Sequence, residues 1–555
     1  MKIKMYLFLL FSLIVCANVH AASLFKHFKG LEDKVPHIPL ANLPTPIYRC
    51  HNLEKILEHD SIFIKRDDLT GSGNLYGGNK VRKLAFLLAD AVRSGAKKIV
   101  TFGSAGTNHG LATACYCKEL GLDCLLMLKN QPNSPVVRQN LLLDHYFNAE
   151  IEIFANNVER KAALDEVLKT NNDIYFFPTG GSIPLGALGY VDAAFELKEQ
   201  IEKGDMPKPD LIYLPVGSCG TTAGLLLGLA LAQIDSKIIA IAVEPEEKLN
   251  EFEETTKKLF SETNQLLNSF CDALPIVEFP NEQLIINKNF CGEQYGLWMR
   301  CVEDIVRVMK NEEGIIVEGT YSAKPIAALI ADIRNHTRNS DEVILVWNTY
   351  CGLDFSHLTD TVDYKQLNPK VHRYFEDAQL VDVSQTNPTV ILDLKFATAD
   401  NFTGEVLYSS PTCLLLKIVA ESLAEAVQEF ESLGYKVKIW DGYRPPKVSA
   451  KLWELMPDAR FIADPKDGGS RHNRGCAIDL TLIDAHGNEL DMGTCFCHFS
   501  ERSYRDYQDL PAEVLRNRKF LETVMEKHGF VGLKTEWWHF DYKHWLQYPI
   551  IDISL

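Results

Sequence analysis

Three residues in the last part of the chain, His472, Asp479 and His539, have side chains that can bind one metal ion. Two imidazoles and a carboxylate are a typical ligand set for catalytic zinc, which keeps a fourth position for water. Because zinc lowers the pKa of that water to near neutrality, these residues predict a hydrolytic zinc (Zn2+) site.

Two further charged residues accompany this set without being needed as ligands. Glu536 lies three positions before His539, and in a regular strand the two would face opposite sides, so a bulge or turn must bring both into the cleft. Glu536 would then act as general base for the water and as acid for the leaving amine. Arg444, between Gly442 and Pro445, is expected to stabilise the oxyanion of the tetrahedral intermediate.

A second reactive group lies far upstream and suggests a different cofactor. The run from Gly217 to Thr222 follows a predicted strand and opens a predicted helix, so its N–H groups and hydroxyls can cradle a phosphate. Such turns also use glycine and serine for purely structural reasons. Lys80 follows two glycines at the start of an amphipathic helix, and a lysine combined with a phosphate cradle predicts an aldehyde cofactor held as a Schiff base.

Length and charge limit the possible classes of protein. A chain of 555 residues is too long for one hydrophobic core, so two domains are expected. The proportions of 46% hydrophobic and 24% charged residues are those of an ordinary folded protein. A net charge of -17 argues against nucleic acid as the main partner.

Residues 1–22 have the pattern of an export signal peptide. A basic start is followed by an apolar run from Tyr6 to Val15 and by small residues at Ala21 and Ala22. The run is too short to span a bilayer, and no later stretch approaches the roughly 20 apolar residues that a span requires. We therefore expect a periplasmic or secreted protein with no membrane span in its mature form.

Between Ile62 and Leu353, short β-branched runs alternate with longer amphipathic runs, which is typical of parallel βαβ units. Strands are predicted over 97–102, 123–128, 210–216 and 236–243, and helices over 108–120 and 221–233. The alternation lapses after Leu353, so we place a domain boundary near residue 365. The domain over 366–555 is predicted to be α+β, with strands over 390–396, 435–440, 477–483 and 537–542 and a long helix over 411–433.

Four upstream motifs resemble the pyridoxal-phosphate enzymes of the D-cysteine desulfhydrase and aminocyclopropane-carboxylate deaminase family. In the family's order, they are Gly77 to Leu84, Gly103 to His109, Gly217 to Thr222 and Tyr321 to Lys324. The resemblance covers roughly residues 40–355 of a domain over 23–365. It implies fold type II, in which two α/β subdomains with parallel sheets hold pyridoxal 5′-phosphate between them.

The resemblance assigns roles around this cofactor by matching position. Lys80 would form the Schiff base and Asn79 would contact the pyridoxal hydroxyl. The phosphate would be held by Gly217, Ser218, Cys219, Gly220, Thr221 and Thr222. Ser322 falls where the family places the partner of the pyridine nitrogen. Because a hydroxyl cannot hold the pyridinium proton as a carboxylate does, early loss of a leaving group is favoured over transamination.

The same family implies a substrate side. Thr107 and Asn108 would bind the substrate carboxylate, although the family usually has Ser where Thr107 stands, and Tyr295 and Tyr321 would line the pocket. The chain departs from the family at 348–352, where Asn-Thr-Tyr-Cys-Gly replaces the usual His-Thr-Gly-Gly. Bulkier side chains there would crowd the cofactor or change the substrate, so a non-catalytic domain is an alternative.

The downstream motifs resemble the D-alanyl-D-alanine dipeptidases of the vancomycin-resistance type. They include Asp441-Gly-Tyr-Arg-Pro, the run from Ser470 to Asp479, and Glu536-Trp-Trp-His539. The resemblance implies an α+β zinc dipeptidase domain over 366–555 that hydrolyses D-Ala-D-Ala, with Ser470 binding the substrate amine or carboxylate. A D,D-carboxypeptidase acting on muropeptides is the alternative.

Both resemblances concern D-amino acids, so together they predict an exported bifunctional enzyme that acts on peptidoglycan fragments and small molecules. D-alanine has no β-leaving group, so β-elimination cannot consume the dipeptidase product. The first domain would instead racemise or deaminate a small amino acid, or act independently on D-Cys or D-Ser. A scaffold that supports the dipeptidase is the alternative, and analogy with fold type II relatives favours a homodimer.

Overall fold

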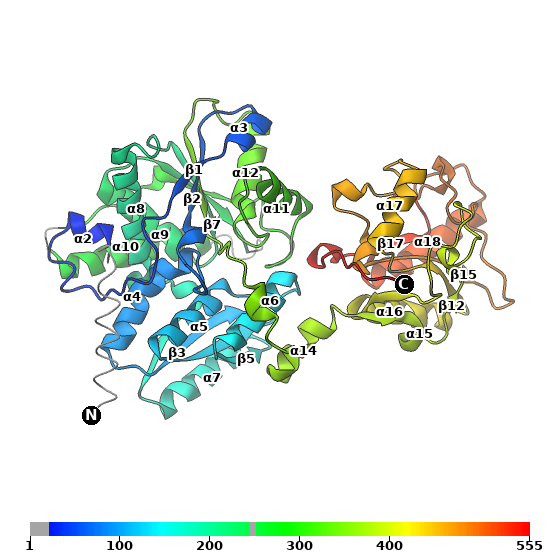
Figure 1. Ribbon diagram of the computed structural model, residues 1–555, viewed down its shortest axis with the longest axis horizontal. Coiled ribbons are helices and arrows are strands. Elements are labelled where there is room, and N and C mark those ends of the chain that lie inside the picture. The colour runs from blue at the N-terminus through cyan, green and yellow to red at the C-terminus, as the bar shows by residue number, and fades with distance from the viewer. Residues whose placement is uncertain (1–21, 245–250, 273) are drawn as a thin grey trace. The chain divides into compact units, whose positions relative to one another are not determined.

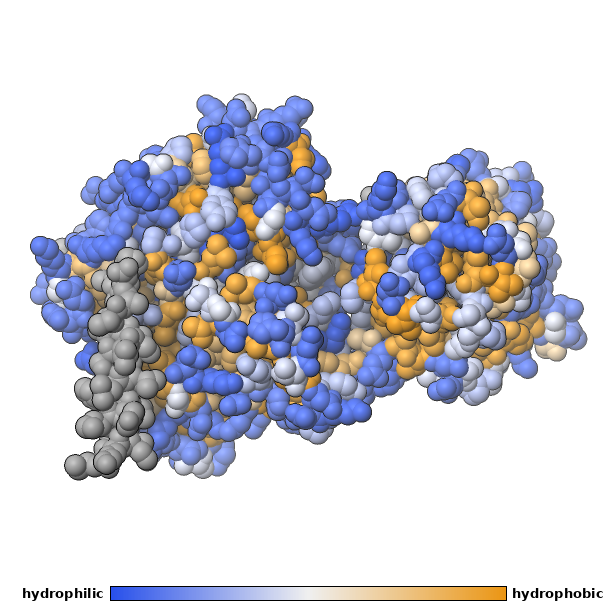
Figure 2. All heavy atoms as spheres, viewed as in Figure 1, coloured by the Kyte–Doolittle hydropathy of each residue, from blue (hydrophilic) through white to orange (hydrophobic). Residues whose placement is uncertain are grey.

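The computed structural model describes residues 22–244, 251–272 and 274–555. Two compact units divide between Val371 and His372, inside helix α14 (Pro369–Glu376) (Figure 1). Apart from Ala22, the predicted signal peptide lies outside the described residues. Among the helices of the described ranges, none combines the length and the apolar character that crossing a membrane requires. On the face drawn in Figure 2, hydrophilic residues cover most of the surface and hydrophobic ones gather in patches.

The first unit contains a six-stranded sheet whose strands are parallel except for the edge strand β1. Its order is β1 (Ile47–Arg49), β2 (Ile62–Arg66), β10 (Ile344–Asn348), β7 (Leu211–Val216), β8 (Lys237–Ala242) and β9 (Leu284–Asn287). Alternate residues of a strand face opposite sides. Ile212 and Leu214 therefore join the core under α8 (Pro184–Lys203), α9 (Gly220–Ala232) and α10 (Glu251–Phe270). Leu211 and Tyr213 join the core under α3 (His51–Leu57), α11 (Arg300–Glu312) and α12 (Ala323–Arg334).

A second sheet in the same unit has four strands, all parallel. Its order is β5 (Glu150–Phe154), β4 (Asp123–Lys129), β3 (Lys98–Ser104) and β6 (Ile174–Phe177). The helices that accompany this sheet are α4 (Asn79–Arg93), α5 (Asn108–Leu120), α6 (Pro135–Tyr146) and α7 (Asn157–Thr170). Short helices α2 (Ser23–His27) and α13 (Ser356–Thr359) lie near the ends of the unit. The two parallel sheets confirm the predicted α/β class.

The second unit is built on a five-stranded mixed sheet. Its order is β12 (Ile391–Leu392), β14 (Lys436–Asp441), β15 (Ala477–Ile483), β17 (His539–Tyr542) and β16 (Phe530–Gly532), and only β12 and β14 are parallel. Helices α16 (Lys417–Ser432) and α18 (Ala512–Lys527) cover one face, and α15 (Val383–Thr386) and α17 (Pro446–Leu455) complete the unit. The predicted α+β class is confirmed.

Two predicted elements of this unit are wrong in extent. The first residues of the expected helix over 411–433 form β13 (Leu414–Leu416), which pairs antiparallel with β11 (Leu380–Asp382), and α16 begins only at Lys417. The expected strand over 390–396 is reduced to β12. Asp393 forms ion pairs with Lys395 and Lys438, and the chain then enters a 3-10 turn.

Four charged side chains form a buried network beneath α4. Arg82 binds Asp67 at 2.8 Å and Glu196 at 3.0 Å, and Lys65 binds Glu196 at 2.5 Å. All four are at most 2% exposed, and two positive charges balance two negative ones. Because α4 also carries Lys80, two residues before Arg82, the network fixes the start of this helix in the unit.

We expect Arg82→Leu to destabilise the first unit by about 3–5 kcal/mol, because it leaves two buried carboxylates without their main partner. Differential scanning calorimetry of the full chain measures the change. The matched variant Arg93→Leu removes an exposed arginine from the same helix and is expected to change stability by less than about 0.5 kcal/mol. Equal effects of the two substitutions would show that the network does not hold the helix.

Candidate active sites

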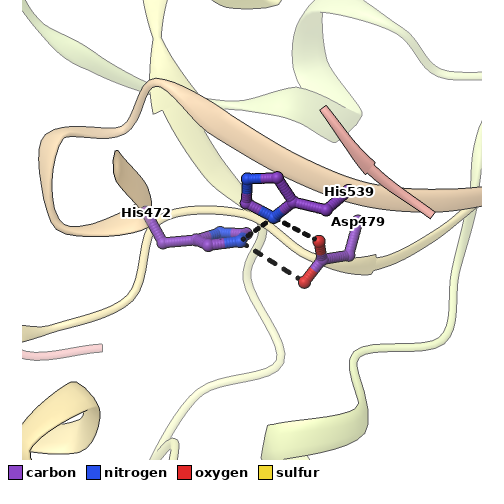
Figure 3. Close-up of side chains that lie close together, drawn as sticks. All are labelled: His472, Asp479 and His539. Atoms are coloured by element: carbon purple, nitrogen blue, oxygen red, sulfur yellow. Dashed lines mark hydrogen bonds and ion pairs between the residues drawn. The ribbon is translucent and has the colours of Figure 1, made fainter. Parts of the chain in front are cut away.

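The structure brings His472, Asp479 and His539 together in the second unit, with one ligand atom of each within 4.8 Å of the others (Figure 3). Asp479 on β15 pairs in register with His539 on β17, so their side chains share one face of the sheet. His472 enters from a 3-10 turn that follows Ser470. The nitrogen Nδ1 of His539 is 3.0 Å from Asp479 and 3.2 Å from Nε2 of His472.

Neighbouring acceptors fix the tautomers of both histidines. Nδ1 of His472 lies 2.6 Å from the carbonyl oxygen of Gly442, which only accepts, so Nδ1 carries the proton and Nε2 faces the cluster with its lone pair. Nε2 of His539 lies 2.9 Å from a carboxylate oxygen of Asp541 and donates to it, so Nδ1 is the nitrogen that faces the cluster. Two imidazole nitrogens and a carboxylate therefore converge in a buried space, and this arrangement fits a zinc ion.

The charges around the cluster favour a bound cation. Burial opposes a positive charge on His539, but Asp541 and Asp479 outweigh burial and raise its pKa to about 10. Desolvation also opposes the charge on Asp479, and the two histidines lower its pKa nonetheless. A site that holds a proton this firmly also attracts a metal ion in its place.

Glu536 and Arg444 line the same pocket. Glu536 lies in the turn before β17. This strand begins at His539 and not at the predicted residue 537. The turn brings Glu536 and His539 into one pocket, as expected from the sequence. The carboxylate of Glu536 is 3.9 Å from Nδ1 of His539, and burial raises its pKa to about 8. Two nitrogens of Arg444 donate to Asp441, at 2.9 and 2.7 Å, and a third contact at 3.8 Å reaches Asp479.

Ser470 also lines the pocket, but its hydroxyl accepts the backbone N–H of His472 at 3.2 Å. Its side chain therefore holds a ligand-bearing turn in place as well as facing the pocket. Asp541, which the sequence reasoning missed, orients His539 as described above. The signal was available, because Asp541 follows His539 by two residues in a strand and shares its face.

A pocket in the first unit gathers the upstream candidates. Lys80 is the second residue of α4, whose N-cap Gly78 has φ +89°, a conformation that only glycine adopts freely. A Cβ on Gly78 would lie 2.9 Å from the carbonyl oxygen of Thr349, which accepts the N–H of Asn79. The pocket is lined by Asn79, Lys80, Thr107, Asn108, Gly217, Ser218, Cys219, Thr221, Thr222, Tyr295 and Tyr321, among others. Burial lowers the pKa of Lys80 to about 8.

The turn between β7 and α9 is suited to bind a phosphate. Cys219 adopts φ +63°, which turns successive N–H groups toward one side at the start of α9. The hydroxyl of Thr222 is buried and has no hydrogen-bond partner among the described residues. A Cβ on Gly220 would lie 2.9 Å from Nζ of Lys83. A buried orphan donor and a cradle that only glycine leaves open fit the phosphate of pyridoxal phosphate.

Lys83 is a further residue that the sequence reasoning missed. Its ammonium is fully buried and donates to the carbonyl oxygen of Gly180 at 3.1 Å and to Ser182 at 3.3 Å, and Ser182 donates to Ser218 at 2.8 Å. Burial, followed by the charge of Lys80, lowers the pKa of Lys83 well below its usual value. Its position three residues after Lys80, on the same face of α4, was the available signal.

The residues expected on the substrate side of the pocket form hydrogen bonds with other residues of the protein. Thr107 caps α5 by accepting the N–H of Gly110 at 3.1 Å, and Asn108 accepts a hydrogen bond from Tyr76 at 3.1 Å. The hydroxyls of Tyr295 and Tyr321 lie 2.6 Å apart. One of the two hydroxyls therefore donates a hydrogen bond to the other at the pocket wall.

Two positions bear on the expected departures from the family. Ser322 is 1% exposed, accepts the N–H of Glu318 at 2.8 Å, and is absent from the described residues that line the pocket. Tyr350, from the segment that replaces His-Thr-Gly-Gly, does line it. The structure thus places a phenol ring at the pocket wall, where the family usually has a glycine.

Comparisons with known proteins match each unit separately. The family described as pyridoxal-phosphate dependent enzyme matches residues 38–349, and the family described as D-ala-D-ala dipeptidase matches residues 376–550. D-alanyl-D-alanine dipeptidase of Escherichia coli (strain K12) is 40% identical over 176 residues, which are 32% of this chain and 91% of that protein. D-cysteine desulfhydrase of Serratia proteamaculans (strain 568) is 31% identical over 326 residues, 57% of this chain and 93% of that protein.

A solved structure is also similar to the first unit. The crystal structure of an ACC deaminase homologue has a TM-score of 0.50 and 30% sequence identity, and it covers 60% of this chain and 95% of its own. These similarities confirm the two family resemblances that the sequence motifs carry.

We expect Asp541→Asn to weaken zinc binding about 10- to 100-fold, because the substitution removes the charge that orients His539 and makes it more basic. Competition with a chromophoric chelator measures the affinity. Asp509→Asn, an exposed aspartate of the same unit, is the control and is expected to leave the affinity unchanged. Unchanged zinc affinity in Asp541→Asn would contradict the role given to this carboxylate.

Proposed function

The chain belongs to the pyridoxal-phosphate dependent enzymes over residues 38–349 and to the D-ala-D-ala dipeptidase family over residues 376–550, and from this premise we propose that it is an exported bifunctional enzyme. The second unit hydrolyses the dipeptide D-Ala-D-Ala with zinc. The first unit uses pyridoxal phosphate to deaminate, desulfhydrate or racemise a small amino acid. The observation that carries the proposal is the convergence of two imidazole nitrogens and the Asp479 carboxylate in one buried pocket.

In the second unit the protein's own groups position the substrate and move protons. Zinc, when bound by His472, Asp479 and His539, supplies a Lewis acid and an acidified water. Glu536 takes a proton from the water and passes it to the leaving amine. Without a metal, the raised pKa of Glu536 keeps its carboxyl group protonated at neutral pH. The positive charge of a bound zinc ion would favour the deprotonated carboxylate, which is the form that acts as a base.

Arg444 stabilises the negative charge that develops on the carbonyl oxygen of the substrate. Asp441, which also accepts a hydrogen bond from Tyr408 at 2.7 Å, holds the guanidinium in one orientation. A donor that is fixed before the reaction stabilises developing negative charge without further reorganisation.

In the first unit Lys80 is the residue expected to hold the cofactor. Pyridoxal phosphate, when bound, supplies an aldehyde for an amino group and a ring that withdraws electrons. The lowered pKa of Lys80 raises the fraction of neutral amine near pH 7. Gly217 to Thr222 and Lys83 would hold the phosphate, and the Tyr295 and Tyr321 pair can exchange a proton with a substrate or leaving group.

The two reactions and the predicted export fit degradation or recycling of peptidoglycan fragments. Hydrolysis of D-Ala-D-Ala yields D-alanine, which has no β-leaving group. The first unit therefore either deaminates or racemises, or it acts on another small amino acid such as D-Cys or D-Ser. Tyr350 narrows the pocket and favours a small substrate.

We expect Glu536→Gln to lower kcat for D-Ala-D-Ala hydrolysis about 10³-fold while zinc remains bound, because the proton carrier is lost and the ligands are kept. Product D-alanine is quantified by chromatography, and bound zinc by elemental analysis. Glu513→Gln, an exposed position of the same unit, should retain full activity. Near-normal turnover by Glu536→Gln would exclude this residue as the base.

We expect the full chain, after addition of pyridoxal phosphate, to absorb near the visible edge, and Lys80→Ala to lack this band because the amine that binds the aldehyde is gone. Lys97→Ala, an exposed lysine, is the control. Purified enzyme is then mixed with D-Cys, D-Ser and D-Ala while 2-oxo acids and chirality are followed. A colourless wild-type protein with intact dipeptidase activity would favour the scaffold alternative.

A further inference from the structure

The second unit has another cavity beside the catalytic pocket. This side cavity, of about 390 Å³, is lined by Trp440, Thr481, Asp400 and Glu489, among others, and it shares Phe496 and Cys497 with the catalytic pocket. The roles proposed above for catalysis and metal binding use none of the first four residues.

The sheet that carries the zinc ligands also builds the side cavity. Thr481 lies on β15 two residues after Asp479, so both side chains project from the same face of the sheet. Trp440 lies on the neighbouring strand β14, where the register shifts between Ile439 and Asp441. The ring of Phe496 packs against Trp440, with centroids 5.1 Å apart, and forms part of the wall between the two cavities.

Two polar groups of the side cavity have no partner. The indole Nε1 of Trp440 and the hydroxyl of Thr481 are buried and make no hydrogen bond to any described residue. Trp440 is 4% exposed and Thr481 is 1% exposed. An indole N–H can only donate, and leaving it unpaired in the interior is unfavourable. The pair therefore calls for an acceptor that the rest of the chain does not provide.

The side cavity is also lined by two exposed carboxylates, which accept hydrogen bonds. The carboxylates of Asp400 and Glu489 are 82% and 46% exposed, and each is paired at 2.7 Å with a lysine, Lys395 and Lys438 respectively. A carboxylate has room for further donors. The side cavity is thus lined by two residues with an unpaired polar atom and by two carboxylates that are more exposed.

We propose that the side cavity binds a small zwitterionic amino acid, with its carboxylate toward Trp440 and Thr481 and its ammonium toward Asp400 and Glu489. The choice of D-alanine as ligand rests on the proposed function, because D-alanine is the product of dipeptide hydrolysis in the adjoining pocket. The arrangement of donors and carboxylates does not depend on that reaction. An occupant would contact Phe496 and Cys497, which also line the catalytic pocket.

The test is a fluorine NMR titration of the full chain labelled with 5-fluorotryptophan. The Trp440 resonance is assigned from its loss in Trp440→Phe, and D-alanine is added to the protein. We expect a saturable shift of this resonance. D-alaninol, which lacks the carboxylate, should give no saturable shift.

A pair of variants separates binding from folding. Thr481→Val removes a hydroxyl that has no partner, so it should not destabilise the fold, and it is expected to raise the dissociation constant for D-alanine about tenfold, equal to about 1.4 kcal/mol. Trp453→Phe removes an indole N–H outside the side cavity and should leave binding unchanged. No saturable shift, or equal affinity in Thr481→Val and the wild type, would overturn the proposal. Saturation without any dipeptide hydrolysis would instead retain the side cavity and refute the proposed function alone.

Discussion

The second unit depends on the convergence of two imidazole nitrogens and one carboxylate in a buried pocket. Gly442 and Asp541 each accept a proton from one histidine, which leaves Nε2 of His472 and Nδ1 of His539 facing the cluster. The negative character of the cluster is thus imposed by its surroundings, and a cation is the natural compensation. The register between β15 and β17, the turn at Glu536 and the Asp441 clamp on Arg444 all serve this centre.

The pocket of the first unit is suited to a ligand of the opposite charge. It is lined by Lys80 and lies at the N-terminus of α9, whose N–H groups favour an anion, and Lys83 lies close to Gly220 at the same turn. The neutral network of Asp67, Arg82, Glu196 and Lys65 lies on the other side of α4 and fixes the helix without adding net charge. One chain thus combines a cation-selecting site with an anion-selecting site, each in its own unit.

Local sequence signals were sufficient for much of this architecture. Helix α5 matches its predicted range, since Thr107 caps its start and Gly121 ends it in a left-handed conformation. The three candidate metal ligands were recognisable because they stand in specific motifs. The run Leu414–Leu416 was misassigned to a helix because three leucines suit either structure, and only the distant partner Leu380–Asp382 decides for a strand. The side cavity had no sequence signature, because Trp440 and Thr481 meet only when the strands pair.

The proposed zinc site formed by His472, Asp479 and His539 can be tested directly. Anomalous diffraction at the zinc edge, from crystals of the full chain grown with zinc, locates the metal and its ligand atoms. We expect a single site in the second unit, bound by Nε2 of His472, Nδ1 of His539 and the carboxylate of Asp479. Zinc bound through the opposite nitrogen of either histidine, or no zinc at this place, would contradict it.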